Sequence, residues 1–200
     1  MINIGEELTS IYLRVNGFLQ LSNFVIHRTE NNEKGECDIL ALRLIKMKES
    51  IYFKDKPEIV SSFDYSNEIL GHEILDLAKD IYLWVEVTLR NDLTKKYVEG
   101  KFSDSKSKYV AERLGIQDWV DTCDLSSNSF YIGPRNDKVF AKVLVCGRTL
   151  EEKSNTCLYT DFDWVKIQIR DWFQKYGEIK GRDWHVWVNP LLQALAKQII

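Results

Sequence analysis

The 200-residue sequence is poor in glycine and proline, with ten and three residues, and this excludes collagen-like and low-complexity classes. Its apolar runs are strand-sized and far shorter than the ~20 residues that a membrane helix needs. The first residues also lack the basic and then apolar pattern of a secretory signal. We therefore expect a cytoplasmic protein with no membrane partner.

Paired metal-binding cysteines are also missing. The four cysteines, Cys37, Cys123, Cys146 and Cys157, form no Cys-x-x-Cys pair, which argues against a zinc knuckle. Cys37 and Cys146 lie in apolar runs and are expected to pack in the core of a protein from a reducing compartment. A formal net charge of -3 gives no overall sign of nucleic-acid binding, so any such surface must be local.

What the sequence does contain is a series of short apolar segments that alternate with amphipathic ones. Helical spacing predicts helices, and β-branched or aromatic runs predict strands. The expected helices cover 4–16, 66–80, 105–116, 161–177 and 189–200, and the expected strands cover 18–27, 37–45, 81–90 and 138–147. Asn16-Gly17 and Gly177 are read as helix stops. The order predicts an α/β fold, one domain over 1–200, with 46–80 as a variable insertion and 160–200 as a C-terminal helical part.

Two acids interrupt these apolar strands. Glu86 lies within "IYLWVEVTLR", and Asp38 opens "DILALRL". A buried carboxylate is costly unless it is paired or binds a metal. If the strands that carry Asp38 and Glu86 are neighbours, the two carboxylates can converge, and a hard divalent ion would relieve their repulsion.

Simpler explanations exist for each acid. Glu86 could form an ion pair with Arg43 or Arg90, or face solvent at an edge, and Asp38 could bond turn amides at the start of its strand. Glu6 and Glu7 could simply place favourable charge at a helix N-terminus.

The segments "GEELTSIYLRVNGF", "NFVIH", "ECDILALRL" and "WVEVT", in this order, resemble the PD-(D/E)xK nuclease superfamily, which includes restriction endonucleases, and more closely a bacterial subgroup of it. The resemblance implies a restriction-endonuclease-like core, helix-strand-strand-strand-helix-strand, with a mixed sheet of four to five strands flanked by helices. It also implies a metal-dependent phosphodiesterase site that uses Mg²⁺ or Mn²⁺. Asp38 matches the acid of the second strand, Glu86 matches the Glu of the Glu-x-Lys motif, and Glu6 matches the acid of the first helix, with Glu7 as the alternative.

The sequence departs from the superfamily pattern at Thr88, where a lysine is expected. That lysine orients the attacking water and stabilises developing negative charge. Arg90 lies on the same predicted strand face and is a candidate substitute, and Lys95 or Lys96 could reach in from the next segment.

A basic segment with interleaved aromatic residues follows the third strand. Cations and aromatic rings of this kind can hold a phosphate backbone and stack bases, although mixed charge runs are commonly solvated helix faces. The candidate nucleic-acid-binding residues are Lys95, Lys96, Lys101, Lys106 and Lys108.

The sequence thus leads to two hypotheses. The first is a metal-dependent nuclease that hydrolyses DNA in bacterial defence or repair, with Glu6, Asp38 and Glu86 as metal ligands and Thr88 and Arg90 beside the phosphate. The second is an inactive protein of the same fold that binds nucleic acid or a protein partner. A homodimer formed through the tryptophan-rich C-terminal region is a further possibility.

Overall fold

The structure is a computed structural model of the chain. It describes residues 3–26, 35–44, 51–53, 56–58, 68–73, 79–90, 93–116, 128–133, 138–147 and 154–180. The expected helix at 189–200 and the tryptophan-rich segment lie outside these residues, as does Cys123.

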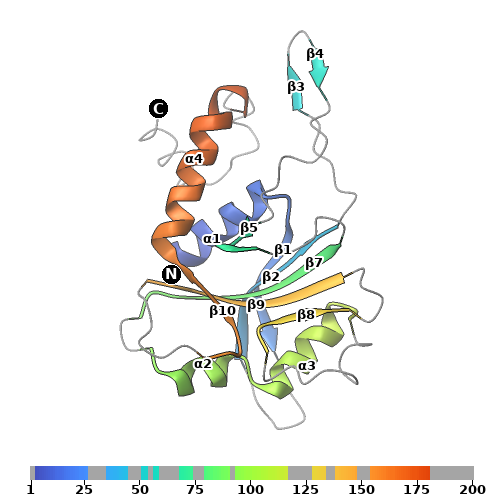
Figure 1. Cartoon of the computed structure of the whole chain (residues 1–200), viewed down its shortest axis with the longest axis vertical. Coiled ribbons are helices and arrows are strands. Elements are labelled where there is room, and N and C mark those ends of the chain that lie inside the picture. Colours follow the sequence, from blue (N-terminus) through green and yellow to red (C-terminus); the bar gives the residue numbers. More distant parts are fainter. Residues whose placement is uncertain are drawn as a thin grey trace.

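A six-stranded mixed sheet forms the centre of the protein (Figure 1). Its main path runs β1 (Leu19–Ile26), β2 (Gly35–Arg43), β7 (Asp80–Thr88), β9 (Lys138–Cys146) and β10 (Leu158–Asp161), and β8 (Phe130–Ile132) also pairs with β9. The pairs β1–β2, β2–β7 and β8–β9 are antiparallel, whereas β7–β9 and β9–β10 are parallel. The predicted α/β class with a mixed sheet is confirmed, although the sheet has six strands instead of four or five.

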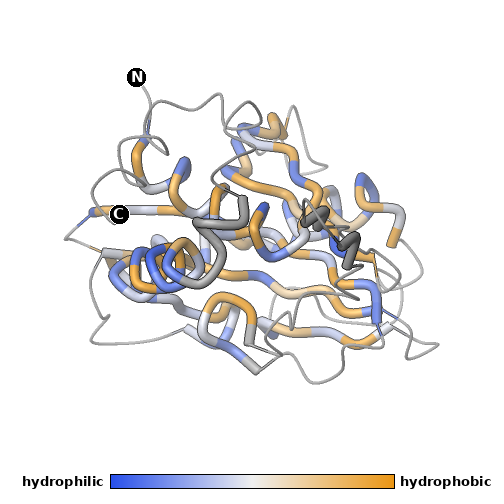
Figure 2. The backbone as a smooth tube through the Cα atoms, turned by 90° about the horizontal axis from the view of Figure 1, so that it is seen from above, coloured by the Kyte–Doolittle hydropathy of each residue, from blue (hydrophilic) through white to orange (hydrophobic). Residues whose placement is uncertain are grey.

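Helices cover both faces of this sheet. The helices α1 (Ile4–Val15) and α4 (Phe162–Lys180) lie on one face, and α2 (Lys95–Lys101) and α3 (Asp104–Arg113) lie on the other (Figure 1). Alternate residues of β7 therefore feed two separate cores, with Leu83 and Val85 toward α1 and Tyr82 and Trp84 toward α2. Figure 2 shows hydrophobic stretches along the central strands, as expected for strands that are buried on both faces.

Local signals explain where several elements begin and end. Asn3 caps α1 by accepting a hydrogen bond from the Gly5 N–H, and Gly17 follows the helix with a φ of 80°. A positive φ favours glycine, so the predicted stop at Asn16-Gly17 is confirmed. Thr94 caps α2 in the same way by accepting from the Tyr97 N–H.

Other sequence-based expectations are wrong. The predicted helix at 66–80 is replaced, over its described part, by a small hairpin of β5 (Glu68–Ile69) and β6 (His72–Glu73), because Gly71 takes a φ of 77°. The predicted insertion at 46–80 also contains a second hairpin, β3 (Ile51–Phe53) with β4 (Lys56–Glu58). Helix α4 continues through Gly177 to Lys180, so that glycine is not a stop.

The structure also contains elements that the sequence did not indicate, namely α2, β8 and β10. No helix among the described ranges is long and apolar enough to cross a membrane. Cys37 and Cys146 are buried, as expected for core residues.

Candidate functional site

The candidate site lies where β2 and β7 separate. Their ladder ends at the pair Ile39–Val85, so continuing the register by one residue puts Asp38 opposite Glu86. At this point the Asp38 Oδ2 atom accepts the Val87 N–H at 2.7 Å, a side-chain bond in place of a ladder bond. The two strands are therefore neighbours, which is the condition under which the two carboxylates can converge, and Asp38 and Glu86 lie at the same end of the pair.

Glu86 is almost completely buried, with 1% of its side chain exposed, on the sheet face that α2 covers. Its Oε1 atom accepts the Trp84 Nε1–H at 2.8 Å, and its Oε2 atom accepts from the Lys101 Nζ, also at 2.8 Å. Trp84 itself packs edge-on against Phe102 with ring centroids 4.9 Å apart. Each oxygen of the carboxylate therefore has its own donor.

Lys101 reaches this carboxylate from the last residue of α2. The buried side chains of Val98 and Phe102 anchor that end of the helix in the core. The Lys101 side chain remains 31% exposed, so its ammonium lies between the buried acid and solvent. From the sequence, Lys101 is one of the candidate nucleic-acid-binding lysines, and nothing in the sequence indicates its contact with Glu86.

The shifted pKa values of Asp38 and Glu86 show that negative charge is disfavoured at this site. Burial and then repulsion from Asp38 raise the pKa of Glu86 to about 7, despite the bonds from Lys101 and Trp84. Burial also raises the pKa of Asp38, against the Val87 N–H bond and the charge of Lys101, which lower it. For Lys101, burial alone would lower the pKa, but the charge and hydrogen bond of Glu86 and the charge of Asp38 together outweigh burial and raise the pKa. Lys101 therefore stays charged while the two acids compete for a proton or a cation.

Glu6 belongs to the edge of the same cluster. It lies in the first turn of α1 beside Glu7, and the Asn3 side-chain amide donates a hydrogen bond to its carboxylate. Burial and then repulsion from Asp38 raise its pKa. The N-terminus of α1 approaches the site closely, since a Cβ at Gly5 would lie 3.0 Å from the Val87 side chain. Glu6, Asp38 and Glu86 thus come from three separate elements, α1, β2 and β7.

Thr88 and Arg90 are placed differently from each other. Thr88 ends β7 as a buried residue, and its hydroxyl accepts the Arg90 N–H at 3.3 Å. The Arg90 guanidinium lies over the Tyr97 ring, 5.4 Å from its centre. Arg43, the other arginine considered for Glu86, lies at the far end of β2 over Phe18. The cation paired with Glu86 is Lys101 and neither of these arginines.

The remaining lysines lie on and around α2 and α3. Lys95 and Lys96 are exposed in the first turn of α2. Lys106 donates to the Gly100 carbonyl at 3.1 Å and lies beside Gly35, at the start of β2. Lys108 pairs with Asp104 at 2.9 Å on the surface. Two positions, 101 and 106, thus bring positive charge to the open end of the β2–β7 pair.

The donor set can be tested for its fit to a divalent cation. In the part of the chain that the structure describes, no three acidic, histidine or cysteine side chains are grouped as a metal site. The two carboxylates of Asp38 and Glu86 nevertheless suit Mg²⁺, which is commonly bound through one or two carboxylates and completed by water and substrate phosphate. Their raised pKa values also show excess negative charge that a cation would relieve. In chemical type the residues therefore fit Mg²⁺ or Mn²⁺.

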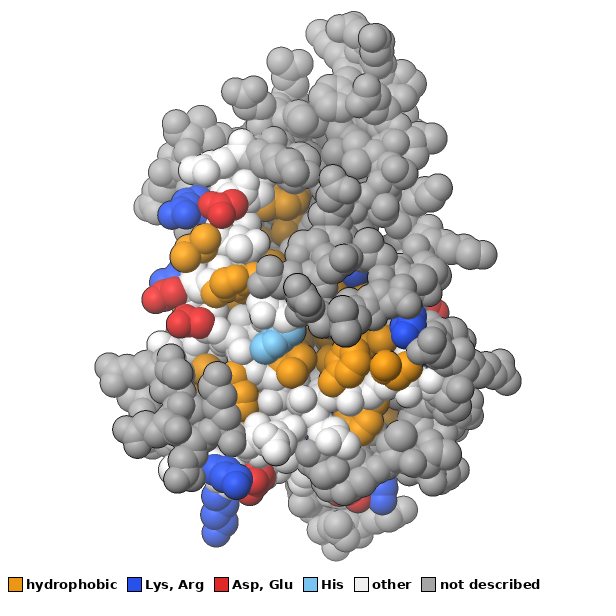
Figure 3. All heavy atoms as spheres, viewed as in Figure 1, with side chains coloured by type: hydrophobic (Ala, Val, Ile, Leu, Met, Phe, Trp, Pro, Cys, Tyr) orange, Lys and Arg blue, Asp and Glu red, His pale blue; other side chains and the backbone are white. Residues whose placement is uncertain are grey.

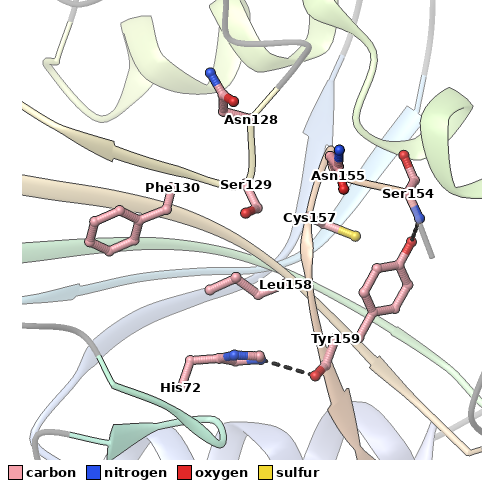
Figure 4. A pocket seen from close by; sticks show the side chains of 9 residues that line it. All are labelled: His72, Asn128, Ser129, Phe130, Ser154, Asn155, Cys157, Leu158 and Tyr159. Carbon is pink, nitrogen blue, oxygen red and sulfur yellow. Dashed lines mark hydrogen bonds between the residues drawn. The ribbon is translucent and has the colours of Figure 1, made fainter.

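A separate hollow opens elsewhere, between β8 and β10, with a volume of about 450 Å³ (Figure 4). His72, whose ring nitrogen bonds the Tyr159 carbonyl at 3.0 Å, forms one wall, and Phe130 and Leu158 form apolar walls. Asn128, Ser129 and Asn155 add neutral polar groups. Figure 3 shows hydrophobic side chains gathered over the middle of this face of the molecule. None of the sequence-predicted site residues lines this hollow.

The chain matches no protein-family model, and comparisons with curated proteins and with solved structures also gave no match.

Proposed function

We propose that the protein is a metal-dependent nuclease that hydrolyses DNA phosphodiesters, with a restriction-endonuclease-like core. The single observation that carries this proposal is the contact of the Lys101 ammonium with Glu86, beside Asp38, at the open end of two neighbouring strands. Two carboxylates and one lysine are the groups that this reaction requires. The sequence lacked the lysine at position 88, and helix α2 brings one to the same carboxylate.

Each residue has a distinct role in this proposal. Asp38 and Glu86 hold the Mg²⁺ or Mn²⁺ ion, and Glu6 adds negative charge at the edge of the site. When bound, such an ion polarises the phosphodiester and lowers the pKa of a water molecule. Lys101 orients the attacking water and stabilises the negative charge that develops on the phosphate oxygens.

The order of the elements supports the proposed core. When the short strands β3 to β6 and β8 are set aside, the order α1, β1, β2, β7, α2 with α3, and β9 matches the helix-strand-strand-strand-helix-strand order that the resemblance implies. Asp38 and Glu86 lie on the second and third strands of this order, and Glu6 lies at the start of the first helix.

The basic surface around α2 supports DNA as the substrate. Lys106 presents positive charge near the open end of the site, Lys95 and Lys96 are exposed in the first turn of α2, and the Arg90 guanidinium lies over the Tyr97 ring of the same helix. Cations of this kind bind the phosphate backbone without regard to base sequence. DNA lying along α2 would therefore bring a phosphate toward Lys101.

The test is cleavage of plasmid and single-stranded DNA with Mg²⁺ or Mn²⁺ by the purified chain and four variants. Asp38→Asn, Glu86→Gln and Lys101→Met should each lower the cleavage rate by about 100-fold or more, since each removes a ligand or a charge that acts in the transition state. The matched control is Lys166→Met, because Lys166 is an ion-paired lysine on α4. Its rate should equal that of the unaltered protein, and cleavage that survives in Asp38→Asn would contradict the proposal.

A second candidate function is an inactive protein of this fold that binds nucleic acid or a protein partner. One observation favours it: both oxygens of Glu86 already have donors, Trp84 and Lys101. The same assay separates the two candidates. DNA that binds with a strong dependence on salt, but is not cleaved under any metal condition, would favour the inactive protein.

A further inference from the structure

We propose that Lys101 is a stand-in cation, which a divalent ion must displace from the Oε2 atom of Glu86 before the site can act. The inference rests on the proposed function and concerns how that site is loaded. It predicts that Lys101 opposes metal binding while it supports cleavage. A lysine that only stabilises the fold would not separate these two effects.

Glu86 has only one carboxylate oxygen whose bonding partner can readily be exchanged. Its Oε1 atom accepts from the indole of Trp84, whose side chain is fully buried. Turning Oε1 toward a metal would leave the buried indole N–H without this acceptor, which is costly. A cation must therefore bind at Oε2, where the Lys101 ammonium now lies at 2.8 Å.

The Lys101 ammonium can move away from the Oε2 atom of Glu86 while helix α2 stays in place. Its backbone ends α2, and the neighbouring Val98 and Phe102 side chains are buried and hold the helix in place. Its own side chain is partly exposed and ends in a single ammonium on a flexible stem. Movement of the ammonium toward solvent therefore breaks the ion pair with Glu86 and leaves the buried Val98 and Phe102 side chains in place.

Charge favours the same exchange. With Lys101 in place, the ammonium and the carboxylates of Glu6, Asp38 and Glu86 carry two net negative charges when all three acids are ionised, and this charge repels a phosphate. A divalent ion neutralises these two charges and frees the Lys101 ammonium. The exchange thus removes the repulsion of DNA and leaves the lysine available to the phosphate.

The experiment measures Mn²⁺ binding to the full chain by isothermal titration calorimetry, without DNA. Lys101→Met should bind Mn²⁺ about tenfold or more tightly than the unaltered protein, because a competing unit charge within a few ångströms is removed. The same variant should cleave DNA more slowly. Glu86→Gln should lose the binding, which assigns the signal to this site, and Lys166→Met should bind as the unaltered protein does.

Each outcome is informative. Equal or weaker Mn²⁺ binding by Lys101→Met overturns the stand-in role and leaves the proposed nuclease function intact. Absence of Mn²⁺ binding in both the unaltered protein and Lys101→Met overturns the metal-dependent function itself, and the inference with it. Lys101→Gln, which retains a polar side chain, replaces Lys101→Met if the latter fails to fold, and the same change in affinity is expected.

Discussion

At the scale of single residues, the cost of burying Glu86 is met by specific donors. Trp84 and Lys101 each bond one oxygen, and Asp38 lies close enough to repel it. These bonds reduce the cost of burial without abolishing it, because the pKa of Glu86 is still raised to about 7. In the folded protein the Glu86 carboxylate therefore gains or loses its proton near neutral pH.

This raised pKa leads to a prediction on stability. The folded protein binds more protons than the unfolded chain between the ordinary pKa of 4.5 and about 7. The free energy of unfolding should therefore fall as pH rises through that range, and Glu86→Gln should remove up to about 3 kcal/mol of the fall. Urea denaturation at pH 4.5 and pH 7.5, in the presence of a chelator, measures this difference. An unchanged pH dependence in Glu86→Gln would contradict the assignment.

The sequence could indicate the two strand acids because a carboxylate inside an apolar run is conspicuous. It could not indicate Lys101, which is one of several lysines after β7, all in a polar context. The choice among them depends on where α2 ends and on how Val98 and Phe102 pack, which are tertiary facts. Trp84 was missed for a similar reason, although its position two residues before Glu86 places both on one strand face.

At the scale of elements, the packing of α1 against β7 determines how close Glu6 lies to the acids on the sheet. Its first turn carries Glu6 and packs against β7 through Gly5, next to the Val87 N–H that holds Asp38. A larger residue at this position would have to move either the helix or the strand, because Val87 belongs to the core.

A pair of glycine substitutions tests this contact. Gly5→Ala should destabilise the protein by about 1–3 kcal/mol, because the new methyl group would lie 3.0 Å from Val87. The control is Gly100→Ala in α2, where nothing lies within 4 Å and the better helix propensity of alanine should stabilise by up to about 1 kcal/mol. Thermal melts of the two variants measure the opposite signs. A Gly5→Ala variant as stable as the unaltered protein would show that α1 does not press against β7.

The errors of sequence reading at this scale have local causes. The segment before β7 had helical spacing, but Gly71 and Leu70 both take positive φ and turn the chain into a hairpin. In α4, Gly177 lies within a helix that continues for another turn, since glycine is tolerated inside helices at a modest cost. Strands β8 and β10 are only three and four residues long, and such short segments carry little periodicity.

At the scale of the whole molecule, the predicted α/β class with a mixed sheet is confirmed, because long apolar strands alternate with amphipathic helices. The structure adds that β1, β2 and β7 are antiparallel neighbours. The sequence could not predict which strand lies next to β7 on its other side. That strand is β9, and the connection between the two parallel strands contains the helices α2 and α3. That crossover has a functional consequence. It places α2 over the sheet face that carries Glu86, and this position lets Lys101 contact the Glu86 carboxylate.

The central claim is that Lys101 supplies the cation that the sequence lacks at position 88. It is tested most directly by moving the lysine. Thr88 lies on the same strand face as Glu86, two residues along, so a lysine there can approach the same acids. The measurement is the DNA cleavage rate, with Mg²⁺ and at fixed salt, of the unaltered protein, Lys101→Met, and Lys101→Met combined with Thr88→Lys. Lys101→Met should lower the cleavage rate by about 100-fold or more, and adding Thr88→Lys should restore at least a tenth of the original rate. Full activity in Lys101→Met, or no recovery in a double variant that folds and binds Mn²⁺, would contradict it.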